Sequence, residues 1–377
     1  MAQPHDHAGP GARPTERGDR RTDTGCLEFL HAIPTLPLYI VTILLATHAR
    51  YLDHNAGVGH PERPARLDAV LSGVKEAGLD GALVPIEPRP ASRAQLERVH
   101  PVAYLDAIER LSQTGGGRID ADTTANAATW EAALLAAGAG LVAIEALDRG
   151  EASAAFCAVR PPGHHATATR AMGFCFVNNV AVMAAELAAR GERVLIVDYD
   201  AHHGNGTQDI FYADERVLYV SFHEWPLYPG TGSLSQTGTG PGAGRTVNFP
   251  FPEGTTGDTY LAAVDDVLDP IVERFRPTWL VVSAGFDAHR RDPITGLGLS
   301  AGDFGVLTER LCQYAPEGRR ILVLEGGYDL QALADSAGAA VAALAGVQHH
   351  PEVPTSGGPG RSVVTAARTQ WSAMGVL

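Results

Sequence analysis

The chain has 377 residues, of which 45% are hydrophobic, and its 43 acidic and 29 basic residues give a net charge of −14. This balance repels polyanions, and no run of lysine and arginine provides a local basic patch, so we expect no nucleic-acid partner. No apolar run approaches the roughly 20 residues needed to cross a bilayer, so we expect no membrane span. The length fits one large α/β domain.

The cysteines give no sign of a metal or disulfide framework. The four of them, Cys26, Cys157, Cys175 and Cys312, lie far apart and form no CxxC pair. This spacing indicates neither a disulfide scaffold nor a cysteine zinc site. We therefore expect buried free thiols and a cytoplasmic protein.

The two ends of the chain differ in composition from its middle. Residues 1–33 are rich in Pro, Gly, His and charge, and are expected to be a disordered leader. Residues 36–46, LPLYIVTILLA, resemble either a secretion signal or an opening strand. We favour the strand because Val and Ile dominate it and no small-residue cleavage site follows cleanly. The folded domain is expected to span residues 34–347, and the Pro- and Gly-rich tail 348–377 is assigned no structure.

Helical and strand-like runs alternate from residue 120 onward. Helices are expected at 123–150, 178–191 and 258–276, with one more between residues 287 and 320. Strands are expected at 154–160, 194–200, 217–223, 278–287 and 320–329. Short strands rich in Val, Ile and Leu, separated by helices, are typical of a parallel sheet that is covered on both faces.

Clusters of His, Asp and Tyr directly follow four of these strands. The clusters are RPPGHHA at 160–166, DYDAHHGNG at 198–206, GFDAH at 285–289 and EGGYD at 325–329. Ligands bind beyond the carboxyl ends of the strands in open parallel sheets, so we expect the four clusters to converge on one crevice.

The second cluster has the spacing of a metal site. Strand alternation places Asp198, Asp200 and His202 on one side of an extended backbone. Carboxylate and imidazole groups are suitable zinc ligands, and Asp287 is the best third candidate, which would leave a coordination position open for water and substrate. An isolated DxH is more often a capped strand end, but the other three clusters of polar residues favour the metal site here.

The adjacent histidines His164 and His165 are candidates for proton transfer. Their unperturbed pKa near ~6.5 suits catalysis at neutral pH. A carboxylate or amide behind each ring would fix its tautomer, and Asp198 and Asn205 are plausible backing groups. Alone, such a pair is more often a surface feature.

Tyr328 follows Gly326 and Gly327, which let the backbone bend sharply. Its phenol could therefore approach a metal and donate a hydrogen bond without adding charge. Aimed at a polarised carbonyl, it would stabilise a developing oxyanion. A structural tyrosine at a strand end is the alternative.

Taken together, the motifs resemble the histone deacetylase superfamily in content and order. The four clusters are joined by GFCFVNN at 173–179 and YPGTGS at 228–233, and GHPERPARL at 59–67 looks like the family's amino-terminal signature. The resemblance covers roughly residues 44–345. The RPPGHHA form and Asn205 look more like class II and bacterial members, which include acetoin utilization proteins and acetylpolyamine amidohydrolases.

The resemblance implies the arginase/deacetylase fold, a single α/β domain with a mostly parallel eight-stranded sheet. It also implies one catalytic Zn²⁺ held by Asp200, His202 and Asp287. His165 would be the general base and acid, His164 its electrostatic companion, with Asp198 and Asn205 behind them. Tyr328 would stabilise the transition state.

The resemblance further implies a substrate tunnel and a second ion. Phe174 and Tyr228 would form the aromatic walls, where Tyr228 departs from the usual Phe, and Gly173 and Gly326 would also contact substrate. A structural K⁺ would be held by the backbone carbonyls of Asp198, Asp200 and His202, together with Ser221 and Phe222.

The expected function is hydrolysis of the acetyl amide of N-acetyl-lysine to acetate and a free amine. An acetylpolyamine amidohydrolase has the same chemistry, and a non-catalytic acyl-lysine binding module is a remote alternative. An arginase-like two-manganese site is disfavoured because Gly204 stands where the second ion needs an Asp. Asp120 or Asp122 could orient a cationic or peptide substrate, or both could simply be loop carboxylates. The oligomeric state, including a homo-oligomer, is open.

Overall fold

The computed structural model describes residues 41–377. The expected disordered leader, and most of the segment weighed as a secretion signal, lie outside the described residues. The described residues form one compact unit.

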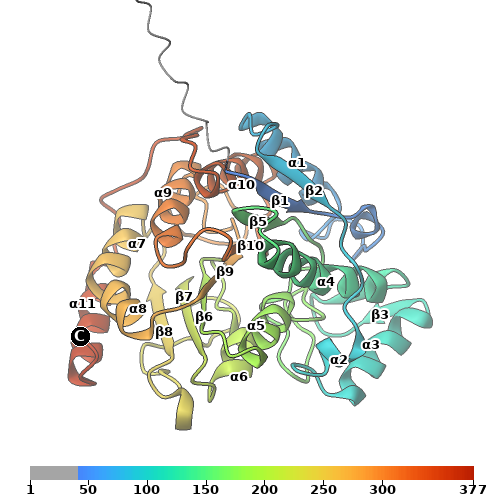
Figure 1. The fold of residues 1–377 in the computed structure, drawn as a ribbon, viewed down its shortest axis with the longest axis horizontal. Coiled ribbons are helices and arrows are strands. Elements are labelled where there is room, and N and C mark those ends of the chain that lie inside the picture. Colours follow the sequence, from blue (N-terminus) through green and yellow to red (C-terminus); the bar gives the residue numbers. More distant parts are fainter. Residues whose placement is uncertain (1–40) are drawn as a thin grey trace, which may run out of the picture. The chain divides into compact units, whose positions relative to one another are not determined.

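A central sheet of eight strands organises the described part of the chain, and all its strand pairs are parallel. The strand order is β2-β1-β5-β10-β9-β6-β7-β8 (Figure 1). This arrangement confirms the expected α/β fold with a mostly parallel eight-stranded sheet. The strands are β1 (Ile43–Ala46), β2 (Leu83–Ile86), β5 (Ala154–Cys157), β6 (Val194–Asp198), β7 (Val217–Glu224), β8 (Thr246–Phe251), β9 (Trp279–Ala284) and β10 (Arg320–Leu324).

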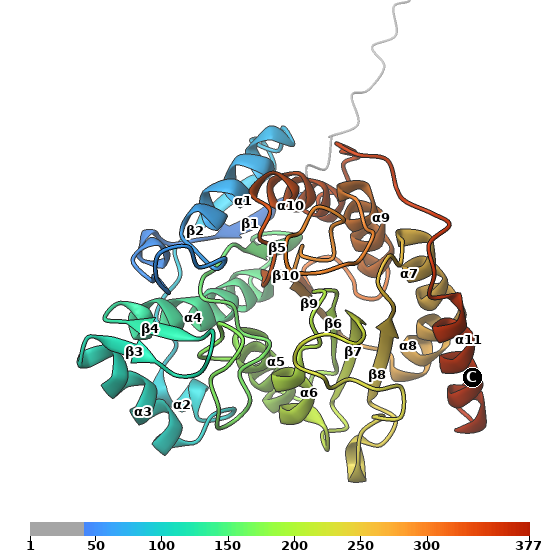
Figure 2. The same cartoon turned by 180° about the vertical axis from the view of Figure 1, so that it is seen from behind.

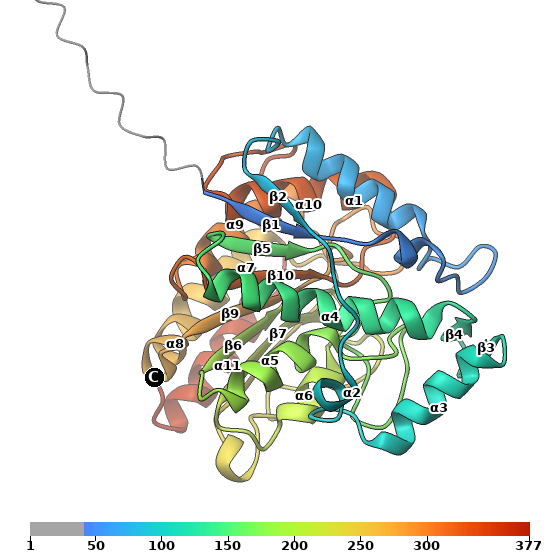
Figure 3. The ribbon, with the colours of Figure 1, turned by 45° about the vertical axis from the view of Figure 1, so that its right-hand side comes forward.

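Helices cover both faces of this sheet. Figure 3 shows α4 and α5 lying across one face, while α1, α9 and α10 pack together beyond the other (Figures 2 and 3). The longer helices are α1 (Ala65–Glu76), α3 (Val102–Gln113), α4 (Thr129–Asp148), α5 (Asn179–Ala189), α9 (Ala301–Cys312), α10 (Leu330–Leu344) and α11 (Arg361–Ala373). The shorter ones are η1 (Ala49–Leu52), α2 (Arg93–Leu96), α6 (Asn205–Phe211), η2 (Gly240–Gly242), α7 (Gly257–Ala263), the π-helix η3 (Val264–Leu268) and α8 (Asp269–Phe275).

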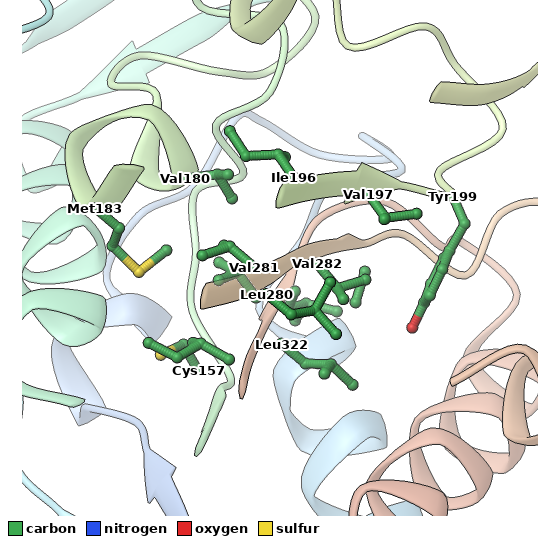
Figure 4. Close-up of a cluster of buried hydrophobic side chains, with 14 of the residues drawn as sticks. Cys157, Val180, Met183, Ile196, Val197, Tyr199, Leu280, Val281, Val282 and Leu322 are labelled. Carbon is green, nitrogen blue, oxygen red and sulfur yellow. The ribbon is translucent and has the colours of Figure 1, made fainter. Parts of the chain in front are cut away.

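The core lies between the central strands and these helices. Every residue of β6 and β9 is buried, because a parallel sheet covered on both faces exposes neither set of alternating side chains. Figure 4 shows Val180 of α5 beside Ile196 and Val281 of these strands. Full burial of each such aliphatic side chain contributes about 1.5–3 kcal/mol. The runs of Val, Ile and Leu therefore both define the strands and stabilise the sheet.

Several elements differ from the sequence expectation. The helix expected at 123–150 begins at Thr129, and before it β4 (Thr124–Asn126) pairs with β3 (Gly116–Arg118) in a separate hairpin. The Thr129 hydroxyl accepts the Asn126 N–H at 2.8 Å, which ends the extended segment and starts the helix. The helix at 258–276 is divided into α7, η3 and α8. Strands β2 and β8 were not among the expected strands; each contains a proline and lies at an edge of the sheet, where a proline is tolerated.

The expectation that no apolar run approaches the length of a membrane span is wrong for helix α4. By length and composition it is apolar enough to cross a membrane, with a mean hydropathy of 1.5 over 18 residues. However, 72% of that window is buried inside the fold, and buried core helices pass the same test. Among the described residues no other helix of this length and hydropathy occurs.

The C-terminal tail is ordered, contrary to the sequence expectation. Helix α11 packs against β8, α7 and η3 through buried Val364, Ala367 and Trp371, whose spacing of three and four places them on one helical face. Upstream of it, Glu352 accepts hydrogen bonds from His289 at 2.7 Å and from the Ala301 N–H at 3.0 Å. The Pro- and Gly-rich composition of residues 351–360 led us to assign no structure to the tail, but helix α11 follows this segment and is stabilised by tertiary packing.

Candidate active site

The four strands that carry the polar clusters are neighbours in the sheet. In the order β5-β10-β9-β6 they lie side by side and parallel, so the loops after their carboxyl ends emerge at one edge. The predicted convergence is confirmed, because side chains and backbone N–H groups from all four loops are hydrogen-bonded to one another there.

The carboxylates of Asp200 and Asp287 and the imidazole of His202 form one buried cluster. One ligand atom from each lies within 4.8 Å of the others. The Nδ1 atom of His202 lies 2.9 Å from Asp287 Oδ2 and 3.2 Å from Asp200 Oδ1. The second oxygen of each aspartate is held by a backbone N–H: Gly326 donates to Asp200 at 2.8 Å and Ala201 to Asp287 at 2.7 Å. The carboxylates are thus oriented from behind.

This donor set fits a divalent cation. Burial, followed by the charge of Asp200, raises the pKa of Asp287 to about 6. Burial alone lowers the pKa of His202, but its contacts with the two carboxylates raise it to about 10. The cluster therefore favours positive charge at its centre. A Cβ atom at Gly326 would lie 2.4 Å from Asp287 Oδ2 and 2.5 Å from Asp200 Oδ2, so only glycine leaves this space free.

The two histidines of the β5–α5 loop lie beside this cluster, with ring centroids 4.0 Å apart and the ring planes tilted by 42°. His164 Nδ1 lies 3.0 Å from Asp198 Oδ2, and His165 Nδ1 lies 2.8 Å from Asn205 Oδ1. One ring is thus backed by a carboxylate and the other by a neutral amide. Since the amide oxygen only accepts, His165 donates from Nδ1, and its Nε2 keeps a free lone pair.

The pKa values of the two histidines are shifted in opposite directions. Burial alone lowers the pKa of His164, but the charges of Asp200 and Asp198 hold it well above its ordinary value. Burial, followed by the charges of His164 and His202, lowers the pKa of His165 well below its ordinary value. His164 can therefore be the positively charged imidazolium, while His165 stays neutral with an unprotonated Nε2.

Tyr328 lies on the opposite side, after the turn through Gly326 and Gly327, whose φ is +119°. The guanidinium of Arg66 lies 4.9 Å from the centroid of its ring. Arg66 also donates to the carbonyls of Gly327 at 2.6 Å and Glu325 at 2.5 Å. The segment that carries the phenol is thus fixed by a buried cation.

A cavity of about 220 Å³ leads to these groups. Phe174 has a positive φ of 68°, which is costly for a residue with a large side chain and places its ring opposite Tyr328, with centroids 5.9 Å apart. A Cβ atom at Gly173 would lie 2.3 Å from the His165 ring, so this position requires glycine. The cavity is lined by Asp122, His165, Gly173, Phe174, His202, Leu227, Tyr228, Ile294 and Tyr328.

The structure separates the two loop aspartates. Asp122 lines the cavity, whereas Asp120 Oδ1 accepts the backbone N–H groups of Asp122 at 3.2 Å and Thr123 at 2.8 Å. Asp120 therefore shapes the turn, and Asp122 is the carboxylate that a bound molecule would meet.

Two residues behind the site, Glu325 and Tyr219, were given no role in the sequence analysis. Glu325 accepts the N–H groups of Gly163 at 2.7 Å and His164 at 3.1 Å, and so fixes the histidine loop. The Tyr219 hydroxyl lies 3.2 Å from Asp198 Oδ2. Both act across strands distant in sequence. Only the position of Glu325, directly after a buried strand, could have marked it.

Comparison with known proteins agrees with this geometry. The family model described as "Histone deacetylase domain" matches residues 60–344. The chain belongs to the histone deacetylase family. It is 42% identical over 290 residues to a "Probable deacetylase" of Archaeoglobus fulgidus, with 75% of this chain and 80% of that protein covered. It is 38% identical over 279 residues to the "Histone deacetylase-like amidohydrolase" of Pseudomonas aeruginosa, covering 72% and 73% of the two chains.

Solved structures place this deacetylase family member in the same fold. The "Crystal Structure of HDA15 HD domain" superimposes with a TM-score of 0.81 at 35% identity, covering 89% of this chain and 97% of that one. The arrangement is therefore the arginase/deacetylase type. Family membership supports a hydrolase that acts on the amides of acetylated molecules.

Proposed function

We propose that the protein is a zinc-dependent deacetylase that hydrolyses the acetyl amide of N-acetyl-lysine. The observation that carries this proposal is the position of the free Nε2 of His165 beside the buried Asp200, His202 and Asp287 cluster, at the base of a tunnel that Tyr328 also lines. Two carboxylates and an imidazole suit zinc, and three ligands leave a coordination position open. When bound, zinc supplies Lewis acidity to the site.

The residues of the chain divide the remaining work. His165 takes a proton from the attacking water through Nε2, while Asn205 holds its tautomer. A protonated histidine of the pair then donates a proton to the departing amine. The Tyr328 phenol donates a hydrogen bond to the acyl oxygen as negative charge develops, an interaction worth about 2.7–4 kcal/mol where it has been measured in other enzymes.

The tunnel favours a long aliphatic amine as the leaving group. Phe174, Leu227, Tyr228 and Ile294 offer apolar walls to the methylene groups of lysine. Asp122 lines the same cavity and could accept a hydrogen bond from a peptide backbone or the ammonium of an acetylpolyamine. Acetylpolyamine hydrolysis is therefore the second candidate function.

The structure disfavours an arginase-like second metal. A Cβ atom at Gly204 would lie 2.1 Å from Asp198 Oδ2 and 2.6 Å from the Tyr219 hydroxyl. A carboxylate at this position has no space, so we propose one catalytic ion for each chain. We also propose a structural K⁺ near the carboxyl end of β6, where Asp198 pairs with Ser221 of β7.

The test is acetate release by the zinc-loaded protein from an acetyl-lysine peptide, acetylputrescine and longer acyl-lysine peptides. We expect the acetyl-lysine peptide to have the highest kcat/KM, and His165→Ala to remove the activity while zinc stays bound. Preference for acetylputrescine would support the polyamine alternative. Absence of acetate from every substrate, with zinc bound, would support a non-catalytic binding module instead.

A further inference from the structure

One buried carboxylate, that of Asp292, accepts hydrogen bonds from two residues that line the cavity. Asp292 lies in the loop after β9, five residues beyond Asp287, and is 8% exposed. Its Oδ2 atom accepts the backbone N–H of Tyr328 at 2.8 Å, and its Oδ1 atom accepts the N–H of Ile294 at 3.1 Å. Tyr328 and Ile294 both line the cavity. Each oxygen of this carboxylate therefore holds one wall residue.

The segment around Tyr328 is held from two sides. Arg66 binds the carbonyls of Glu325 and Gly327, while Asp292 binds the next N–H along the chain. Gly327 itself has a positive φ of 119°, a backbone conformation that residues with a side chain rarely adopt. The Gly327 carbonyl and the Tyr328 N–H belong to one planar peptide. Arg66 and Asp292 therefore hold the two opposite sides of the peptide that carries Tyr328. Without the Asp292 contact, only the Arg66 bond would restrain this peptide.

We propose that Asp292 is a positioning residue for the phenol of Tyr328, acting through the backbone N–H of Tyr328. This inference rests on the proposed function, because Tyr328 is placed there as the donor to the acyl oxygen. A hydrogen bond to developing charge depends steeply on geometry, and a displacement of about 1 Å can reduce a rate roughly a hundredfold. Asp292 thereby also links the position of Ile294 at the tunnel to that of the phenol.

The variant Asp292→Asn tests this link with a small change of shape. An amide has one accepting oxygen, so it can satisfy only one of the two N–H groups, and its own NH₂ then faces the other donor. We expect kcat on the acetyl-lysine peptide to fall about ten- to a hundredfold, with a smaller change in KM. Asp292→Ser, which keeps one short acceptor, gives a second variant if the amide prevents folding.

A double-mutant cycle separates positioning from general loss of stability. In a Tyr328→Phe background no phenol remains to be positioned, so Asp292→Asn should reduce kcat by less than about twofold. Equal fold losses in both backgrounds would overturn the proposal.

The matched control is Asp303→Asn. Asp303 is buried to a similar degree and accepts two backbone N–H groups, from Ser300 at 2.8 Å and Thr355 at 2.9 Å, but it does not line the cavity. This variant should lose thermal stability and keep its kcat. A loss of kcat equal to that of Asp292→Asn would count against a specific role for Asp292.

Hydrogen exchange gives a readout that does not depend on turnover. In the full-length protein, Asp292→Asn should speed exchange of the Tyr328 amide at least about tenfold, while Asp303→Asn leaves it unchanged. Unchanged exchange in Asp292→Asn would overturn the proposal. If the wild-type protein releases no acetate, the proposed function fails, and this measurement still decides whether Asp292 holds Tyr328.

Discussion

A methyl group at position 326 has no space beside the carboxylates of Asp200 and Asp287. A Cβ atom there would lie 2.4 Å from Asp287 Oδ2 and 2.5 Å from Asp200 Oδ2, whereas ordinary contact begins at 3.4 Å. In Gly326→Ala one carboxylate or the backbone must therefore move by about 1 Å, the displacement that typically reduces enzyme rates roughly a hundredfold. The Gly326 N–H that orients Asp200 would move with it. Loss of such supporting contacts weakens metal binding about 10–100-fold in other metal sites.

The assay is competition for zinc with a chelator of known affinity, followed at several protein concentrations. We expect the zinc Kd of Gly326→Ala to rise about 10–100-fold. Gly305→Ala is the matched control, because a Cβ atom in that helix would make only an ordinary contact at 3.5 Å with Ala339. A wild-type zinc Kd in Gly326→Ala, with the same fold by circular dichroism, would refute the argument that this glycine makes room for the ligands.

Three further predictions follow from the geometry. Tyr328→Phe should lower kcat by about 10²–10³-fold and leave zinc content unchanged, as measured by steady-state kinetics and metal analysis; a loss of zinc would contradict this. Trp371→Ala should destabilise the protein by about 3–5 kcal/mol in urea unfolding, because Trp371 is 1% exposed; an unchanged midpoint would show that α11 contributes no stability. Burial opposes ionisation of Glu352, but the Ala301 N–H, His289 and Arg290 lower its pKa to about 2. Ionised Glu352 therefore stabilises the fold above its ordinary pKa of 4.5, and this contribution is lost between pH 4.5 and about 2. The difference in Tm between wild type and Glu352→Gln should shrink over that range, and a constant difference would contradict the pKa shift.

The sequence predicts those parts of the fold in which local pattern and tertiary environment agree. The central strands are continuous Val, Ile and Leu runs because both faces are covered, and each ends in polar residues because the site lies there. Strand β8 contains Pro250, which is acceptable only at the sheet edge. Helix α11 follows a Pro- and Gly-rich segment, and its apolar face is stabilised by the packing of Trp371 against distant elements. Neither the edge position nor the partner surface is visible within a short window of sequence.

The same distinction applies to the site. Asp200, His202 and the histidine pair occur in motifs whose spacing has a chemical meaning. By contrast, Glu325 and Asp292 act by accepting backbone N–H groups from other loops, and such a contact leaves no pattern of residue types in the sequence. Backing residues of this kind are identified only from coordinates.

The adjacency of β5, β10, β9 and β6 affects when the proposed metal site can form during synthesis. Two of the ligands precede Asp287 by more than 80 positions, and the glycine that orients Asp200 comes later still. A nascent polypeptide leaving the ribosome therefore cannot assemble the cluster until most of the domain has been translated and its strands have paired in register. A slip of one residue along β9 would move the Asp287 carboxylate by about 3.3 Å. We therefore expect metal binding to follow the correct pairing of the strands and not to precede it.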